Sequence, residues 1–271
     1  MFNDSPTGRL FTRQSALKVL LPLLVFGGFM GIWFAVGNLR GTNGSLLVPN
    51  YVLPRPGEVW DCFGEEWNSG RLLRDVIASL YCVSVAFLLA VGTGIPFGLF
   101  LGQYLNARLA FQPMVNFFRC LSPIAWIPFA ISWFGIGSGG EIFLIFMASF
   151  FPLVLSTLSA VSTVPAVRFR VANDYDIRGW DRLIRVTLPA ILPQVIMSLR
   201  VTAGIAWVVV VAAEMAGVQH GLGFGIDDAR DALRLDIVVC YMVVIGFLGV
   251  GIDRLLAQLT RLPNVRWGYD R

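Results

Sequence analysis

The stretch VPAVRFRVANDYDIRGWDRLIRVTLPAILP, residues 164–193, decides how this chain is organised. It carries five arginines and three aspartates between two strongly apolar runs. Charges at this density are costly in hydrocarbon, so we expect the stretch to lie outside the bilayer. Pro165 precedes a short helical run, Gly179 permits a sharp turn, and residues 180–188 indicate a second short amphipathic helix. Composition alone predicts no more than a basic cytoplasmic loop.

The composition of the whole chain is that of an integral membrane protein. Its 271 residues are 56% hydrophobic and 14% charged, with a mean hydropathy of +0.70. Soluble domains usually have about a quarter of their residues charged. The net charge of +4 is spread among loops, which argues against binding nucleic acid. The first apolar run is long enough to span and has no small-residue cleavage site after it, so we interpret it as a retained span.

Two scarce residue types exclude several kinds of site. Lys18 is the single lysine and precedes an apolar run, so the chain has no G-x-x-x-x-G-K-[ST] loop for ATP. His220 is the single histidine, which excludes a metal site with several histidines. The four cysteines form no C-x-x-C pair and are interpreted as small apolar side chains. We therefore expect no cofactor and no metal in this chain.

The apolar runs predict an all-α polytopic membrane protein. A span needs about 20 apolar residues, and about six runs qualify: 16–36, 76–101, 113–134, 142–162, 191–216 and 237–259. Residues 103–112 and 135–141 are predicted to connect spans, and residues 59–67 to form a short surface helix. Residues 217–236 are glycine-rich at first and then amphipathic.

Glycines and tryptophans refine this scheme. Gly92, Gly94, Gly98 and Gly102 follow one another along the second run. Small residues let helices approach closely in lipid, so this span is predicted to be buried among others. Trp60 and Trp67 suit a membrane interface.

Basic residues predict the orientation. The N-terminus, the loop with Arg108, the 164–193 stretch and the C-terminal tail fall on one side, which is the cytoplasm by the positive-inside rule. Outer loops also contain arginines, so the bias is moderate. We predict a cytoplasmic segment at 1–15, a membrane domain at 16–259 and a cytoplasmic tail at 260–271. The protein would thus be multi-pass, with both termini cytoplasmic.

In this orientation the central stretch resembles the cytoplasmic loop of permeases of binding-protein-dependent ABC importers. Those loops read E-A-A, three residues, G, and nine residues before I-x-L-P. Ala172 matches the alanine, and residues 186–189 match the end. The pattern is broken where Arg170 replaces the glutamate and Asp176 replaces the glycine.

Further motifs resemble the nitrate, sulfonate, taurine and bicarbonate permeases. Gly179 lies three residues beyond the usual glycine position, a displacement associated with the nitrate and bicarbonate branch. Residues 122–137 are similar to S/P-P-L-A-W-L-P, residues 198–226 to L-R-x-x-x-G-x-x-W and A-E-M followed by G-L-G, and residues 52–60 to L-P-x-P-x-x-V-W. The resemblance covers most of the chain after about residue 50.

The resemblance implies a type I importer permease fold with a cytoplasmic coupling helix at about 164–190. It implies a homodimer in a bacterial-type inner membrane, two cytoplasmic ATPase subunits holding ATP and Mg²⁺, and an external binding protein. This chain would be a transport subunit and not an enzyme. The substrate would be a small anion such as nitrate, bicarbonate, a sulfonate or taurine, selected mainly by the binding protein.

The coupling helix would dock in a groove of the ATPase and move the spans as rigid bodies. Tyr175, Ile177 and Trp180 are the predicted apolar contacts, and Asp174 and Arg178 the polar ones. The full predicted coupling set is Arg170, Ala172, Asp174, Tyr175, Asp176, Ile177, Arg178, Gly179 and Trp180. The alternative is a loop that rests on lipid headgroups.

Ionisable residues within spans mark function by default. Glu214 is predicted to hold a gate closed by hydrogen bonding across a dimer or to a neighbouring helix, or else to cap backbone groups near the outer surface. It lies about 21 Å along the helix from Arg200, so the two cannot pair within it. Arg200 and Arg119 either extend inward or touch substrate.

The predicted pathway wall contains Ser122, Pro123, Trp126 and Trp207. A proline removes a helical hydrogen bond, and a broken helix is tolerated where it faces protein or a water-filled cavity. The alternative for the two tryptophans is ordinary packing. His220 is predicted to be a surface histidine on the outer side, and the alternative is a pH sensor.

Two other functions remain open. A self-contained secondary transporter or channel would act without ATPase partners and needs an ionisable relay near the midplane, of which the sequence shows little. An intramembrane enzyme needs a histidine pair, clustered carboxylates or a G-x-S-x-G element, and none is evident.

Overall fold

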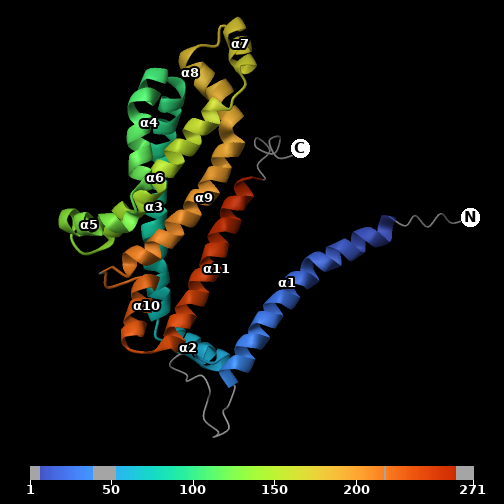
Figure 1. Ribbon diagram of the computed structural model, residues 1–271, viewed down its shortest axis with the longest axis vertical. Coiled ribbons are helices and arrows are strands. Elements are labelled where there is room, and N and C mark those ends of the chain that lie inside the picture. The colour runs from blue at the N-terminus through green and yellow to red at the C-terminus, as the bar shows by residue number, and fades with distance from the viewer. Residues whose placement is uncertain (1–6, 39–52, 217, 261–271) are drawn as a thin grey trace, which may run out of the picture. The chain divides into compact units, whose positions relative to one another are not determined.

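A computed structural model describes the backbone of residues 7–38, 53–216 and 218–260, and the side chains of these ranges from residue 20 onward. This part of the chain is helical and contains no strand, which confirms the all-α prediction (Figure 1). It divides into two units. One comprises residues 1–65 and 229–240, and the other residues 66–228 and 241–271.

The helices, in chain order, are α1 (Thr7–Asn38), α2 (Pro56–Asn68), α3 (Arg71–Gln103), α4 (Leu105–Cys120), η1 (Pro123–Trp126), α5 (Ile127–Phe134), α6 (Ser138–Ser162), α7 (Ala166–Asp174), α8 (Gly179–Arg182), η2 (Leu183–Thr187), α9 (Leu188–Glu214), α10 (Leu222–Asp231) and α11 (Leu235–Leu259). Five helical stretches in the described ranges are long and apolar enough to cross a membrane. They are Leu20–Asn38, Arg71–Gln103, Ser138–Ser162, Gly179–Glu214 and Leu235–Leu259. Large apolar side chains such as Phe26, Leu88, Val208 and Phe247 are more than 60% exposed, as expected for surfaces that face lipid.

The predicted third span differs from a simple helix. Residues 103–112, which were predicted to connect two spans, are helical except at Tyr104. This residue separates α3, which ends at Gln103, from α4, which begins at Leu105. The helix then breaks after Cys120, and Pro123–Phe134 bends away from it by 92°. Counted as one broken span, this pair gives the sixth crossing; it can equally be a re-entrant loop. The other predicted connection, at 135–141, shortens to 135–137.

The core of the larger unit is built from α3, α6 and α9, which run side by side in Figure 1. A Cβ atom on Gly98 would lie 2.7 Å from Cβ of Thr157, and one on Gly102 would lie 2.7 Å from Cβ of Val161. These two glycines therefore let α3 and α6 approach closely, as predicted. Gly92 does not take part, since nothing lies within 4 Å of its added Cβ.

The smaller unit contains α1, most of α2 and the beginning of α11. The indole of Trp33 donates to the carbonyl of Pro54 at 3.1 Å. Glu58 accepts a hydrogen bond from the backbone N–H of Arg55 at 3.0 Å, which caps the first turn of α2. The predicted surface helix is thus confirmed and begins at Pro56. Trp60 on it is 75% exposed.

Some predictions lie wholly or partly outside the described residues. α1 begins at Thr7, nine residues before the predicted start of the first span. Of the predicted cytoplasmic segment 1–15, the backbone of residues 1–6 and all side chains lie outside the described part of the chain. Of the predicted tail 260–271, all residues from 261 on lie outside it.

Candidate functional site

The first candidate region is the charged segment between α6 and α9. α7 follows Pro165 and ends in a tight reversal. The N–H of Ile177 donates to the carbonyl of Ala172 at 2.9 Å, and that of Asp176 to Asn173 at 3.0 Å. This pair of bonds is a Schellman motif, in which one residue after the helix adopts a left-handed conformation.

That left-handed residue is Asp176, with a φ of 51°. It stands at the position where the loop pattern of the permeases described above has glycine, the residue that adopts a positive φ most readily. Aspartate tolerates this conformation better than most residues. Its carboxylate pairs with Arg178 at 2.8 Å. Gly179 also has a positive φ, 56°, and α8 begins there. The sharp turn predicted at Gly179 therefore involves both Asp176 and Gly179.

The predicted coupling residues occupy different environments. Ala172 is buried and packs α7 against its surroundings. Ile177 is half-buried. Tyr175 and Trp180 are 76% and 73% exposed, which is unusual for large aromatic side chains. Arg170 and Asp174 are also exposed. The two aromatic residues are the most exposed large apolar side chains of this segment, where Val167, Val171 and Ile184 are also exposed.

The segment joins α9 without a break. α8 continues into the five-residue π-helical turn η2 and then into α9, so Gly179–Glu214 forms one helical stretch. The predicted amphipathic helix at 180–188 is thus the first part of a longer one. Thr163, after α6, donates its hydroxyl to Gln194 of α9 at 3.1 Å. Because α8, η2 and α9 form one helical stretch, a displacement of α8 would be transmitted to α9.

The second candidate region is the break between α4 and η1. Leu121 and Ser122 are extended, and the Ser122 side chain makes no cap bond to the helix that follows. Pro123 and Trp126 line a groove of about 190 Å³. Ser122 is not among the lining residues, although it directly precedes Pro123 in the sequence. Trp126 packs edge to face against Phe143, with ring centroids 6.2 Å apart.

Trp207 is placed elsewhere. It is 7% exposed, and its indole donates to the carbonyl of Ile245 on α11 at 3.1 Å. In this structure it packs α9 against α11 and does not line the groove. Arg200, on the same helix, forms a bidentate pair with Asp253 of α11, in which Nε donates to Oδ1 at 3.1 Å and Nη2 donates to Oδ2 at 2.9 Å. The sequence predicted that Arg200 extends inward or touches substrate, and it did not predict the pair with Asp253.

The third candidate region surrounds Glu214 at the end of α9. Glu214 is 1% exposed and accepts the backbone N–H of Gly223 at 2.7 Å. The hydroxyl of Ser79 accepts the N–H of Leu222 at 2.9 Å, and Asp75 accepts that of Gly221 at 3.4 Å. Three side chains from α3 and α9 thus satisfy the free N–H groups at the start of α10. In this structure Glu214 caps backbone groups, the structural alternative; a gating role stays a prediction.

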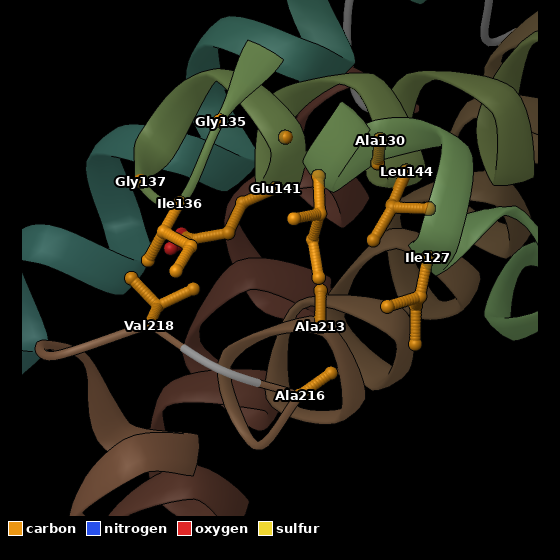
Figure 2. A pocket seen from close by; sticks show the side chains of 12 residues that line it. Ile127, Ala130, Gly135, Ile136, Gly137, Glu141, Leu144, Ala213, Ala216 and Val218 are labelled. Carbon is orange, nitrogen blue, oxygen red and sulfur yellow. The ribbon is translucent and has the colours of Figure 1, made fainter. Parts of the chain in front are cut away.

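A further buried carboxylate, Glu141, lies beside this cap. Its carboxylate is 3.9 Å from Nδ1 of His220, and neither of its oxygens has a hydrogen-bond partner in the described part of the chain. Figure 2 shows Glu141 lining a cavity of about 20 Å³ with Ile136, Ala213 and Val218, which is room for about one water molecule. Within the described ranges, no group of three or more His, Cys, Asp or Glu side chains could hold a metal ion.

Sequence reasoning missed Asp75, Ser79, Glu141 and Tyr241 as members of this cluster. All four are buried, and the Tyr241 hydroxyl donates to Asp75 at 3.0 Å. The signal that singled out Glu214, an acid inside a span, applies equally to Asp75 and Glu141. The predicted spans began at 76 and 142, one residue too late to include either carboxylate.

Known proteins resemble this chain over most of its length. Residues 94–262 match the family described as binding-protein-dependent transport system inner membrane component. The chain is 34% identical over 257 residues to a putative ABC transporter permease protein of Methanocaldococcus jannaschii, covering 93% of this chain and 92% of the relative. It is 30% identical to the taurine transport system permease protein of Escherichia coli, covering 90% and 88%, and 31% identical to the bicarbonate transport system permease protein of Synechococcus elongatus, covering 94% and 93%.

The fold also matches a solved structure. The inward-facing MetNI methionine ABC transporter aligns with a TM-score of 0.58 at 18% identity, covering 70% of this chain and 96% of that chain. A second crystal form gives 0.57 at 21% identity. At this identity the likeness concerns the fold alone.

Proposed function

Because the chain belongs to the family of binding-protein-dependent transport system inner membrane components, an ABC importer permease family, we propose that it carries a small anion into the cytoplasm by alternating access. Two copies would form the pathway, two cytoplasmic ATPase subunits would drive it, and an external binding protein would deliver the substrate. Both termini would face the cytoplasm, and the membrane domain would extend over residues 16–259.

The observation that carries this proposal is the α7–α8 segment. It presents Tyr175 and Trp180 outward and is continuous with α9. A membrane protein without a nucleotide site needs an outside source of work, and an exposed helix joined rigidly to a span can transmit it. Large exposed aromatic side chains are typical of the residues that dominate protein interfaces.

The proposed substrate class comes from the relatives. The similar proteins are described as permeases for taurine, aliphatic sulfonates and bicarbonate. All three substrates carry an oxyanion group. We therefore propose nitrate, bicarbonate, taurine or an alkanesulfonate for this chain, with the binding protein making most of the selection.

The main experiment is reconstitution. The permease is co-purified with its candidate ATPase subunits, and ATP turnover and uptake are measured in proteoliposomes with and without the binding protein and each anion. We expect a stable complex whose ATP turnover rises with loaded binding protein. Uptake by the permease alone, without any ATPase, would instead favour a secondary transporter or channel.

A single substitution tests the coupling segment. Trp180→Ala should weaken ATPase binding by about tenfold or more, because truncating an aromatic interface anchor commonly costs that much. The matched control is Trp60→Ala, since Trp60 is equally exposed at 75% but lies on α2. Equal effects of the two substitutions on ATPase binding would contradict the assignment of the coupling segment.

A further inference from the structure

The groove at the break between α4 and η1 has features that packing does not explain. Three helical regions contribute to it: the end of α4 with η1, the middle of α6, and α9. The lining residues are Phe118, Arg119, Leu121, Pro123, Trp126, Met147, Ala148, Phe151, Pro152 and Ile205. One of these side chains is charged, that of Arg119, and none is a carboxylate. The groove therefore offers a positive charge within a mainly apolar wall.

Arg119 has no counterion among the described residues. Arg71 pairs with Asp228 and Arg200 with Asp253, but no described side chain forms an ion pair or hydrogen bond with Arg119. It lies about 21 Å along α4 from Leu105, whereas the hydrocarbon core is about 30 Å thick. An arginine side chain is far shorter than this distance, so Arg119 cannot reach the Leu105 end of the helix. Arg119 is exposed in this structure, and a guanidinium within hydrocarbon and without a partner is costly unless water or an anion reaches it.

Other polar groups of the groove are also available. The indole N–H of Trp126 has no hydrogen-bond acceptor in the described part of the chain. Pro152 has no N–H, so the carbonyl of Ala148 loses its helical partner. The guanidinium and the indole are donors that suit the oxygens of an anion, and the carbonyl suits an ammonium or hydroxyl on the same molecule.

We propose that the translocated substrate binds in this groove, with Arg119 holding its oxyanion group. The ligand class is a small monovalent oxyanion, recognised by the guanidinium fork and enclosed by Phe118, Trp126, Met147 and Phe151. This inference rests on the proposed function and adds to it a substrate contact within the membrane, separate from selection by the binding protein.

Uptake in proteoliposomes provides the first test. Arg119→Gln should lower uptake by about tenfold or more, while Arg119→Lys keeps part of it, since lysine retains the charge without the bidentate geometry. Complex formation with the ATPase is measured for each variant, so that loss of uptake is separated from failure to assemble. The control is Arg254→Gln, because Arg254 is exposed near the end of α11 and does not line the groove. Equal uptake by wild type and Arg119→Gln overturns the inference, although the proposed function stands.

A thiol reporter tests binding even if Arg119→Gln fails to assemble. Cys120 is exposed and is replaced by serine, and Met147→Cys places a thiol in the groove. With Arg119 present, an anionic sulfonatoethyl methanethiosulfonate should react severalfold faster than its trimethylammonium analogue, relative to their rates with a free thiol. Nitrate, bicarbonate, taurine or an alkanesulfonate should slow the reaction. No charge preference together with no protection by any of the four anions overturns the inference. Absence of ATP-driven uptake in the wild type would instead refute the proposed function.

Discussion

Substitutions of Asp176 test whether the coupling segment depends on its backbone turn or on the aspartate side chain. In the left-handed conformation an ordinary residue is disfavoured by about 1 to 2 kcal/mol relative to glycine. The carboxylate of Asp176 pairs with Arg178, but both side chains are more than 70% exposed, so the pair contributes only about 0 to 1 kcal/mol. The two effects are comparable in size and opposite in sign for a change to glycine.

Asp176→Gly should therefore leave the turn within about 1 kcal/mol of the wild type, and Asp176→Asn should behave similarly. Asp176→Val combines backbone strain with loss of the ion pair, a destabilisation of roughly 1 to 3 kcal/mol. If the ATPase binds only the intact turn, this change weakens its apparent affinity by up to about 150-fold.

The assay is ATPase binding by the reconstituted permease, with ATP-driven uptake as the second readout. Asp181→Val is the matched control, because Asp181 is also an exposed aspartate paired with an arginine, Arg185 at 3.6 Å, but lies within α8. We expect glycine and asparagine to preserve coupling at position 176 and valine to impair it. Coupling that survives valine at 176, or is lost equally with valine at 181, would refute the role of the left-handed turn.

Three further substitutions test packing and polar contacts. Gly98→Ala should lower the melting temperature in detergent, because its Cβ would lie 2.7 Å from a side chain of α6, whereas Gly92→Ala should have little effect. Glu214→Ala leaves a buried N–H of α10 unpaired and should destabilise the fold by about 1 to 3 kcal/mol, whereas Glu214→Gln keeps an acceptor there. Unchanged uptake and basal ATP turnover in Glu214→Gln would exclude its predicted gating role. Arg200→Ala should lower the melting temperature by leaving Asp253 without its bidentate partner, and Arg200→Met with Asp253→Leu should restore much of the loss.

The sequence predicted the helical class and most spans because each depends on local composition. A run of about 20 apolar residues is stable as a membrane span, whereas a run with five arginines is costly to place in hydrocarbon. The short helix beginning at Pro56 and the close approach at Gly98 also follow from local patterns. The position of Asp176 was recognised as unusual, but its φ of 51° came from the structure.

The acidic residues at helix ends show where local reasoning stops. Asp75 and Glu141 lie 66 residues apart in the sequence and belong to different spans, so no pattern connects either of them to Glu214. The break after Cys120 is similar: prolines predict an interruption, but its angle of 92° came from the structure. The pairing of Arg200 with Asp253 likewise depends on how α9 meets α11.

The sequence by itself thus determined that the chain is a multi-pass helical protein, and it predicted a charged, helix-forming segment outside the bilayer, since transfer of each segment between water and lipid depends on that segment alone. Tertiary structure decided which polar groups meet. It placed Asp176 in a left-handed conformation within the 164–193 stretch, buried Ala172, and turned Tyr175 and Trp180 outward. These outcomes depend on contacts between helices and on backbone hydrogen bonds, which no single segment specifies.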